Sequence, residues 1–245
     1  MANLVVDIGN TLTKLAVFEQ DVLVFEGTHQ NEQQLTSLIS TYHIEQTIYS
    51  SVKKDKPEWL DNLSQTMQVI KFSADMAAGI TNQYTTPQTL GVDRIAAVAG
   101  AWHLYPDKSS LVIDGGTTIT YDWVDADGNY FGGSISPGLS MRYKALNNYT
   151  AGLPLIDADA TFNMDYGNST ATAIQSGVQN GLKYELIGFI ENYVKHDNEL
   201  NIILTGGDSN FFDTLLKNSI FAPCVKIEPH LVLIGLNAAL LQHND

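Results

Sequence analysis

The stretch VIDGGTTITY, residues 112–121, repeats a pattern that the chain has already used in VVDIGNTLTK, residues 5–14. Each copy is a short apolar run that ends in an aspartate, Asp7 or Asp114, and continues through glycine and threonine into a second run. Apolar runs of this length, broken by glycine, predict buried strands joined by a tight turn. The repetition therefore predicts two similar halves, each with one such turn.

Around these turns the spacing of apolar residues predicts alternating strands and helices, and hence an α/β chain. Strands are expected at 3–6, 13–18, 21–25, 46–51, 68–72, 110–113, 119–124, 130–135 and 201–204. Helices are expected at 31–42, 57–65, 93–105 and 231–241, with a long helix that begins at Ser169 or Thr170. The polar segment 81–90, which contains Pro87, is expected to be a loop. The predicted lobes are 1–108 and 109–245, and the last helix is able to cross back to the first lobe.

The composition predicts a globular protein and excludes two classes of partner. The chain has 245 residues, of which 44% are hydrophobic and 16% charged, and this is enough for two domains with full cores. Its net charge of −14 repels phosphate backbones and anionic lipid, so we expect neither a nucleic acid nor a membrane partner. Cys224 is the only cysteine, and no signal-peptide pattern or long apolar run is present. A cytoplasmic location is the resulting expectation.

The first turn contains the residue types that a phosphate loop needs. Gly9 lets the backbone approach a phosphate, and the amides and hydroxyls of Asn10 and Thr11 can donate to its oxygens. Asp7 can hold a magnesium ion or its water shell, and Lys14 supplies a positive charge. One copy alone fits a hairpin turn closed by an Asx-type hydrogen bond equally well. The second copy favours phosphate binding, with the two halves facing a shared cleft.

Three further segments have candidate roles and plain structural alternatives. TGGD, residues 205–208, suits the flat face of an adenine or ribose, or is a simple strand-to-helix turn. In GVDR, residues 91–94, Asp93 can cap a helix or accept a proton from a substrate hydroxyl, and Arg94 can bind a carboxylate or lie on the surface. GGSISPG, residues 132–138, either bounds the cleft or turns the chain.

Together these segments resemble the type III pantothenate kinases over nearly the whole chain. The matching pieces, in order, are DIGNTLTK (7–14), GVDRIAA (91–97), VIDGGTTITYD (112–122), GGSISPGL (132–139), GNSTATAIQSG (167–177) and TGGD (205–208). The resemblance implies an α/β fold of two duplicated ribonuclease H-like (actin-like) domains, with mixed sheets flanked by helices. It also implies ATP-dependent phosphorylation of pantothenate to 4′-phosphopantothenate, the first step of coenzyme A biosynthesis.

The resemblance further implies roles for individual residues. The ATP-binding set would be Asp7, Ile8, Gly9, Asn10, Thr11, Leu12, Thr13, Lys14, Thr117, Gly206 and Gly207. Asp93 would be the catalytic base, and pantothenate would contact Tyr84, Gly91, Val92, Asp93, Arg94 and Thr170. Asp114 would ligate a monovalent cation, K⁺ or NH₄⁺, and Asp7 would ligate Mg²⁺. A homodimer with the pantothenate pocket near the subunit interface is expected as well.

Two alternatives to the pantothenate kinase remain open at this point. One is a non-catalytic regulatory relative that binds nucleotide or pantothenate, and the intact set Asp7, Lys14, Asp93, Arg94 and Asp114 argues against it. The other is an actin-like kinase for another hydroxylated small molecule, which GVDR together with Thr170 disfavours. Thr118 stands where the family often has alanine, and its extra bulk could alter the fit of the nucleotide.

Overall fold

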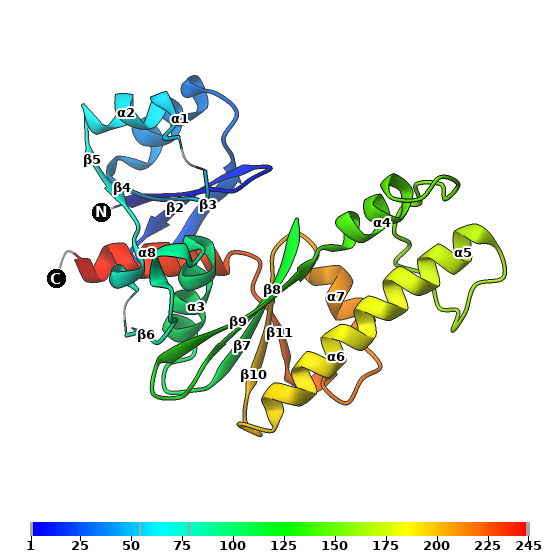
Figure 1. The fold of residues 1–245 in the computed structure, drawn as a ribbon. Helices are drawn as coiled ribbons and strands as arrows, with labels where there is room; N and C mark the ends of the chain where they lie inside the picture. The colour runs from blue at the N-terminus through cyan, green and yellow to red at the C-terminus, as the bar shows by residue number, and fades with distance from the viewer. Residues whose placement is uncertain (1, 54, 78, 244–245) are drawn as a thin grey trace. The chain divides into compact units, whose positions relative to one another are not determined.

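The computed structural model describes residues 2–53, 55–77 and 79–243, and Figure 1 shows its elements. The first part of the chain forms β1 (Ala2–Ile8), β2 (Thr13–Glu19), β3 (Val22–Thr28), α1 (Glu32–Tyr42), β4 (Ile44–Ser51), α2 (Glu58–Ser64), β5 (Gln68–Lys71), η1 (Ala74–Met76), β6 (Thr81–Asn82), η2 (Pro87–Thr89) and α3 (Val92–Leu104). The remainder forms β7 (Ser110–Gly115), β8 (Thr118–Val124), β9 (Asn129–Pro137), α4 (Leu139–Asn148), α5 (Thr170–Gln175), the π-helix η3 (Ser176–Asn180), α6 (Gly181–Val194), β10 (Asn201–Thr205), α7 (Ser209–Leu216), η4 (Ala222–Cys224), β11 (Val225–Ile227) and α8 (Leu231–His243).

The chain divides into two compact units. Unit 1 comprises Met1–Asp107, Gly128–Phe131 and His230–Asp245, and unit 2 comprises Lys108–Asp127 and Gly132–Pro229. The predicted lobes, 1–108 and 109–245, assign Lys108, the start of β9 and α8 differently from these units. Both α8 and the start of β9 belong to unit 1, although they follow the first part of unit 2 in the chain.

The two sheets repeat one strand order. The first sheet runs β3-β2-β1-β4-β5, and the second runs β9-β8-β7-β10-β11 with the two-residue strand β6 added beside β9. In each sheet the first strand pairs antiparallel with the next strand and parallel with the fourth, as β1 does with β2 and β4, and β7 with β8 and β10. The fold is therefore a duplicated α/β architecture with mixed sheets, which confirms the prediction made from the repeated stretches.

Each sheet buries its central strands under its own helices. In unit 1, Leu4 and Val6 of β1 pack in one core cluster with Leu35 of α1 and Leu60 of α2. The cluster of unit 2 joins β7 and β8 to α6 and α7 through Ile113, Tyr121, Leu182, Leu186 and Phe212. Strands covered in this way read as continuous apolar runs, which is why the sequence located them well.

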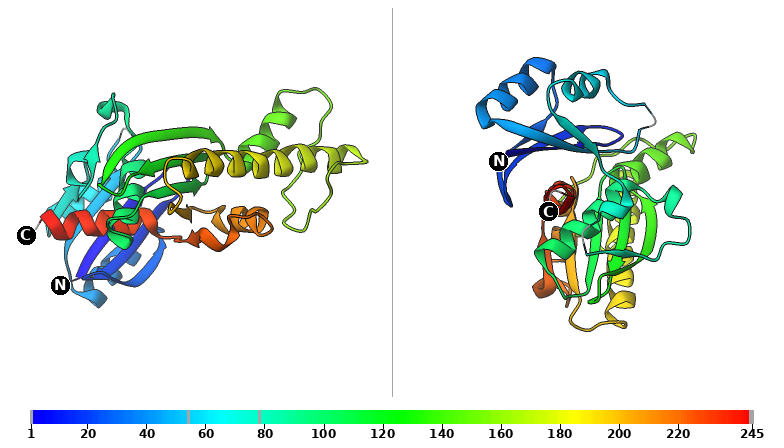
Figure 2. Two further views of the ribbon diagram at one scale, coloured as in Figure 1. Left: turned by 90° about the horizontal axis from the view of Figure 1, so that it is seen from below. Right: turned by 90° about the vertical axis from the view of Figure 1, so that its left-hand side faces the viewer.

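Helices α3 and α8 of unit 1 lie beside each other, as the views in Figure 2 also show. Glycine makes this approach possible at two positions. A Cβ atom on Gly100 would lie 2.2 Å from the carbonyl oxygen of Leu231, and one on Gly235 would lie 1.8 Å from that of Ala96. The two backbones therefore touch where side chains would otherwise separate them.

We expect Gly235→Ala to destabilise the protein by at least about 3 kcal/mol, because the added methyl collides with backbone and the helices must separate. Gly188→Ala in α6 is the matched control, since a Cβ there meets nothing within 4 Å. It should be neutral or stabilise by up to about 1 kcal/mol, the ordinary helix preference for alanine. Urea unfolding of both variants measures the difference, and equal midpoints would contradict the packing argument.

Three expectations about local structure require comment. Segment 81–90 is not wholly a loop, because Thr81 donates its amide to Gly128 and Gln83 donates to Tyr130, which adds β6 to the edge of β9. The long helix is confirmed as α5–η3–α6, and Ser169 is its N-cap. Helices α4 and α7 and strand β11 were not predicted. Among the described residues, no helix is both long and apolar enough to cross a membrane.

Candidate functional site

The first Asp-x-Gly turn lies between β1 and β2 of unit 1. Asp7 and Lys14 are register partners across this hairpin, and the Gly9 amide donates to the Leu12 carbonyl oxygen at 3.0 Å to close the turn. The Asp7 carboxylate instead accepts a hydrogen bond from Ser50 Oγ of β4 at 2.8 Å. The turn is thus closed through its backbone rather than through the Asp7 side chain. Asn10, Thr11 and Leu12 at its tip are exposed and accessible to a ligand.

The Asp7 carboxylate has opposing influences on its ionisation. Burial raises its pKa, the Ser50 hydrogen bond and the Lys14 charge lower it, and the Asp93 charge raises it, with a raised pKa as the net result. Asp93 belongs to the same unit as Asp7, and its charge is the smallest of these influences. Ser50 was not predicted from the sequence; its only signal was its position at the end of a parallel neighbour strand.

We expect Asp7→Asn to raise the melting temperature at neutral pH. Because the folded-state pKa of Asp7 is raised above its ordinary 3.8, the wild-type protein loses stability as pH rises through that folded pKa. Asparagine does not ionise, and its amide oxygen still accepts from Ser50. Melting curves between about pH 4 and pH 7 should show an advantage that grows with pH and then levels. An advantage greatest at acid pH would contradict the raised pKa.

Asp93 lies in the first turn of α3, one residue after the helix begins. Gly91 is the N-cap residue, and Asp93 Oδ1 accepts the Arg94 amide at 3.0 Å. A carboxylate at this end of a helix is stabilised as an anion. A Cβ on Gly91 would lie 2.5 Å from Asp93 Oδ1, so the Asp93 carboxylate can occupy this position only because residue 91 has no side chain. The start of α3 therefore holds a partly exposed carboxylate in the same unit as the first Asp-x-Gly turn.

Next to Asp93, two tyrosines and an arginine form a layered cluster in unit 1. The Arg94 guanidinium carbon lies 5.7 Å from the centre of the Tyr84 ring, and the Tyr84 ring is nearly parallel to that of Tyr130 at 6.4 Å. These distances suit a cation–π contact and an offset stack. Tyr130 is fully buried and was missed by sequence reasoning, because its role depends on the β6–β9 pairing.

The second Asp-x-Gly turn and the TGGD turn meet in unit 2. Asp114 and Thr205 are register partners in β7 and β10, and the Asp208 amide donates to the Gly115 carbonyl oxygen at 3.0 Å. Gly206 has φ +82°, and a Cβ there would lie 2.2 Å from Asp114 Oδ1. Burial raises the pKa of Asp208. Two of the predicted site segments are thus one local structure.

This unit 2 structure has room for a ligand at its glycines. A Cβ on Gly116 or Gly207 would meet nothing within 4 Å, in contrast to one on Gly206. Thr117 is exposed, and its carbonyl oxygen accepts the Gly138 amide. The Gly116 amide donates to the Thr118 carbonyl oxygen. Open glycines beside a carboxylate and a threonine fit the phosphates and metal ion of a nucleotide.

Thr170 is the first residue of α5 and is exposed. Ser169, rather than Thr170, caps the helix, in a capping box with Thr172. The Thr170 hydroxyl is therefore not engaged as the helix cap. It belongs to unit 2, whereas the other predicted pantothenate-binding residues, Tyr84 and Gly91–Arg94, belong to unit 1.

The described residues include no group of three or more histidine, cysteine or acidic side chains placed to hold a metal ion. Magnesium that arrives with a nucleotide needs only one or two carboxylates besides phosphate oxygens. Asp7 and Asp114, each at the end of the first strand of its sheet, are of this type. Each of these two aspartates therefore supplies one carboxylate of the kind that such a metal ion uses.

The duplicated strand order, with an Asp-x-Gly turn at equivalent strand ends, defines an actin-like fold. Solved structures agree: a Campylobacter jejuni protein described as a conserved, proposed Baf family transcriptional activator has a TM-score of 0.64 at 23% identity and 98% coverage of both chains. The Lmo2764 protein of Listeria monocytogenes, described as a proposed N-acetylmannosamine kinase, has a TM-score of 0.57 at 14% identity and full coverage of both. At these identities the likeness shows the fold alone.

The family is shown by the sequence comparisons. Residues 3–196 match the model of the type III pantothenate kinase family. A type III pantothenate kinase of Phocaeicola vulgatus is 45% identical over 99% of both chains. The chain belongs to the type III pantothenate kinase family.

Proposed function

We propose that the protein phosphorylates pantothenate with ATP, giving ADP and 4′-phosphopantothenate in the first step of coenzyme A biosynthesis. The observation that supports this most directly is that Asp93, in the first turn of α3, and the Asp7 turn, between β1 and β2, belong to the same compact unit. The negative charge of Asp93 also contributes, after burial, to the raised pKa of Asp7. Phosphoryl transfer needs proximity and charge compensation more than covalent chemistry.

Asp93 is proposed to accept the proton of the pantothenate hydroxyl as its oxygen bonds to the γ-phosphorus and the bond to the ADP oxygen breaks. Asp93 Oδ1 accepts a hydrogen bond from the Arg94 amide, which restricts the orientation of the carboxylate. Lys14, opposite Asp7 in the hairpin, offsets negative charge on the transferred group. Magnesium, when bound with ATP, would neutralise the phosphate oxygens beside Asp7.

The pantothenate carboxylate is proposed to pair with Arg94, whose guanidinium presents a planar donor pair. Its stacking on Tyr84 limits the orientations of both side chains. Gly91 and Val92 would line the same pocket, and Thr170 would supply a further hydroxyl. These assignments follow from the family motifs matched at the same positions in this chain.

ATP is proposed to bind through residues 7–14 and through Thr117, Gly206 and Gly207. Asp114 would ligate a monovalent cation, K⁺ or NH₄⁺, and Asp7 would ligate Mg²⁺. A homodimer and a cytoplasmic location complete the proposal. The open space beside Gly116 and Gly207 supports the nucleotide assignment.

A coupled assay of ADP release tests the proposal, with pantothenate, other hydroxylated acids and sugars as acceptors, with and without K⁺. We expect turnover with pantothenate only, stimulated by K⁺ and dependent on Mg²⁺. If a sugar were phosphorylated and pantothenate were not, the proposed substrate would be wrong. Binding of ATP and pantothenate without turnover at saturating K⁺ would establish the regulatory alternative.

A further inference from the structure

The glycine-rich run GGSISPG, residues 132–138, has no role in the proposed chemistry, yet it touches the second phosphate turn. It forms the end of β9 and leads into α4. The Gly138 amide donates to the Thr117 carbonyl oxygen at 3.2 Å, and a Cβ on Gly138 would lie 2.1 Å from the carbonyl oxygen of Gly116. Gly138 therefore packs directly against the backbone of this turn, too close for any residue with a side chain.

Arg142 of α4 holds this run in place. Its Nε donates to the Pro137 carbonyl oxygen at 2.8 Å, and its Nη2 donates to Ser136 Oγ at 2.8 Å. Two nitrogens of one planar guanidinium thus fix the two residues that precede Gly138. A lysine, which presents a single ammonium group, cannot reproduce this fork.

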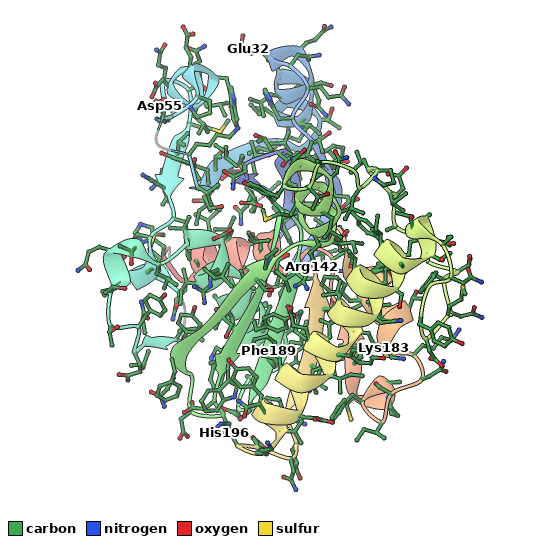
Figure 3. All side chains as sticks on the ribbon, turned by 45° about the vertical axis from the view of Figure 1, so that its right-hand side comes forward. Glu32, Asp55, Arg142, Lys183, Phe189 and His196 are labelled. Carbon is green, nitrogen blue, oxygen red and sulfur yellow. The ribbon has the colours of Figure 1, made fainter. Side chains whose placement is uncertain are left out.

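Arg142 is itself anchored to α6 and to the sheet of unit 2. Its Nη2 lies 2.6 Å from Glu185 Oε2, and Glu185 Oε1 accepts the Tyr121 hydroxyl at 2.9 Å. The side chains of Arg142 and Glu185 are only 19% and 22% exposed, so the pair is shielded from solvent. Tyr121 stacks on Phe189 of α6 with ring centres 4.0 Å apart. Figure 3 labels Arg142 on α4 and Phe189 on α6, the helices that this network joins.

We propose that Arg142, held by Glu185, positions the second phosphate turn for ATP. The continuous path runs from Tyr121 and Glu185 through Arg142 to Pro137, and from Gly138 to Thr117. Arg142 is a positioning residue in this scheme, because it acts on the nucleotide only through the turn. The inference rests on the proposed function in one respect, the assignment of Thr117 to ATP.

Kinetics of Arg142→Met test the inference. Loss of these charged hydrogen bonds should raise KM for ATP about tenfold, because part of their free energy holds the turn in the conformation that binds ATP. KM for pantothenate should change less than about twofold. Arg142→Lys should recover little of the ATP affinity, because the fork is lost. Glu185→Gln, which keeps an acceptor for Tyr121, serves as a milder variant that folds and should give an intermediate KM for ATP.

The double variant Arg142→Met/Glu185→Gln shows whether Arg142 positions the turn or only stabilises the fold. It removes both charges, so it avoids the unpaired, partly buried carboxylate of Arg142→Met and should recover much of the lost melting temperature. It should not recover KM for ATP, since Pro137 and Ser136 still lack their donor. Ile190→Val in the buried face of α6 is the matched control that lowers stability without touching the network. Its KM for ATP should equal that of the wild type.

ADP binding by calorimetry, well below the melting temperature, distinguishes failure of this inference from failure of the proposed function. If the wild-type protein binds ADP but does not phosphorylate pantothenate, the proposed function is wrong. The positioning role of Arg142 still holds in that case if Arg142→Met weakens ADP binding about tenfold. Unchanged ADP affinity in Arg142→Met, or a KM for ATP that recovers together with stability in the double variant, would overturn the inference. No ADP binding by the wild type would overturn both.

Discussion

Replacing Asp93 by asparagine is expected to lower kcat for pantothenate phosphorylation by about 10³-fold, the usual loss when a positioned general base is removed. The amide oxygen can still accept the Arg94 amide, so the start of α3 should remain folded. Because the negative charge of Asp93 raises the pKa of Asp7, its removal should also lower that pKa. Steady-state kinetics with saturating ATP, Mg²⁺ and K⁺ measure the loss, with KM for ATP little changed.

Asp61→Asn is the matched control for this substitution. Asp61 also lies in the first turn of a helix of unit 1, α2, where it pairs with Lys56 at an exposed position. Exposed pairs of this kind contribute little to stability, so this variant should be fully active. If Asp93→Asn kept the wild-type rate, or if Asp61→Asn lost as much activity, Asp93 would not be the base.

The second large effect is expected from Gly206→Ala, which should lower kcat/KM for ATP by at least about a hundredfold. The backbone at Gly206 has φ +82°, and the new methyl would lie 2.2 Å from Asp114 Oδ1 and 2.3 Å from the Gly115 carbonyl oxygen. Alanine therefore introduces backbone strain and displaces the carboxylate proposed to ligate the cation. The melting temperature should fall as well.

Gly207→Ala, one residue further in the same turn, is the control for stability. A Cβ there meets nothing within 4 Å, so the variant should melt as the wild type does. Nucleotide kinetics of the same variant show whether ATP occupies this open space, in which case KM for ATP rises without loss of stability. A Gly206→Ala variant with unchanged melting and unchanged ATP kinetics would contradict the steric argument.

Much of the architecture was predictable because the deciding signals are local. The strands that precede Asp7 and Asp114 are buried on both faces and read as apolar runs, and glycine marks the turns that follow. Elements with weaker signals were missed. Strand β11 has three residues and β6 two, and both exist through pairing with β10 and β9 rather than through their own propensity. Helix α4 begins at a glycine without a side-chain cap.

The candidate site was predictable in its residue types but not in its partnerships. The motifs named Asp7, Asp93 and Asp114, and Asp93 is oriented by its neighbour Arg94, but other partnerships join residues that lie far apart in the chain. Ser50 is 43 residues from Asp7, and Glu185 is 43 residues from Arg142. Tyr130 reaches Tyr84 only because β9 pairs with β6.

The sequence by itself determined the duplicated α/β class and the two Asp-x-Gly turns, because each depends on backbone geometry within a few residues. The residues that bind phosphate and accept a proton stay predictions from the same motifs. Only the tertiary structure decided which partner each charge has and which glycine is indispensable. Packing of strands and helices buries Asp7 and leaves no room for a side chain at Gly206. The same packing brings the Arg142 guanidinium to its hydrogen-bond acceptors. Desolvation and close packing act through space, and spacing along a chain does not encode them directly.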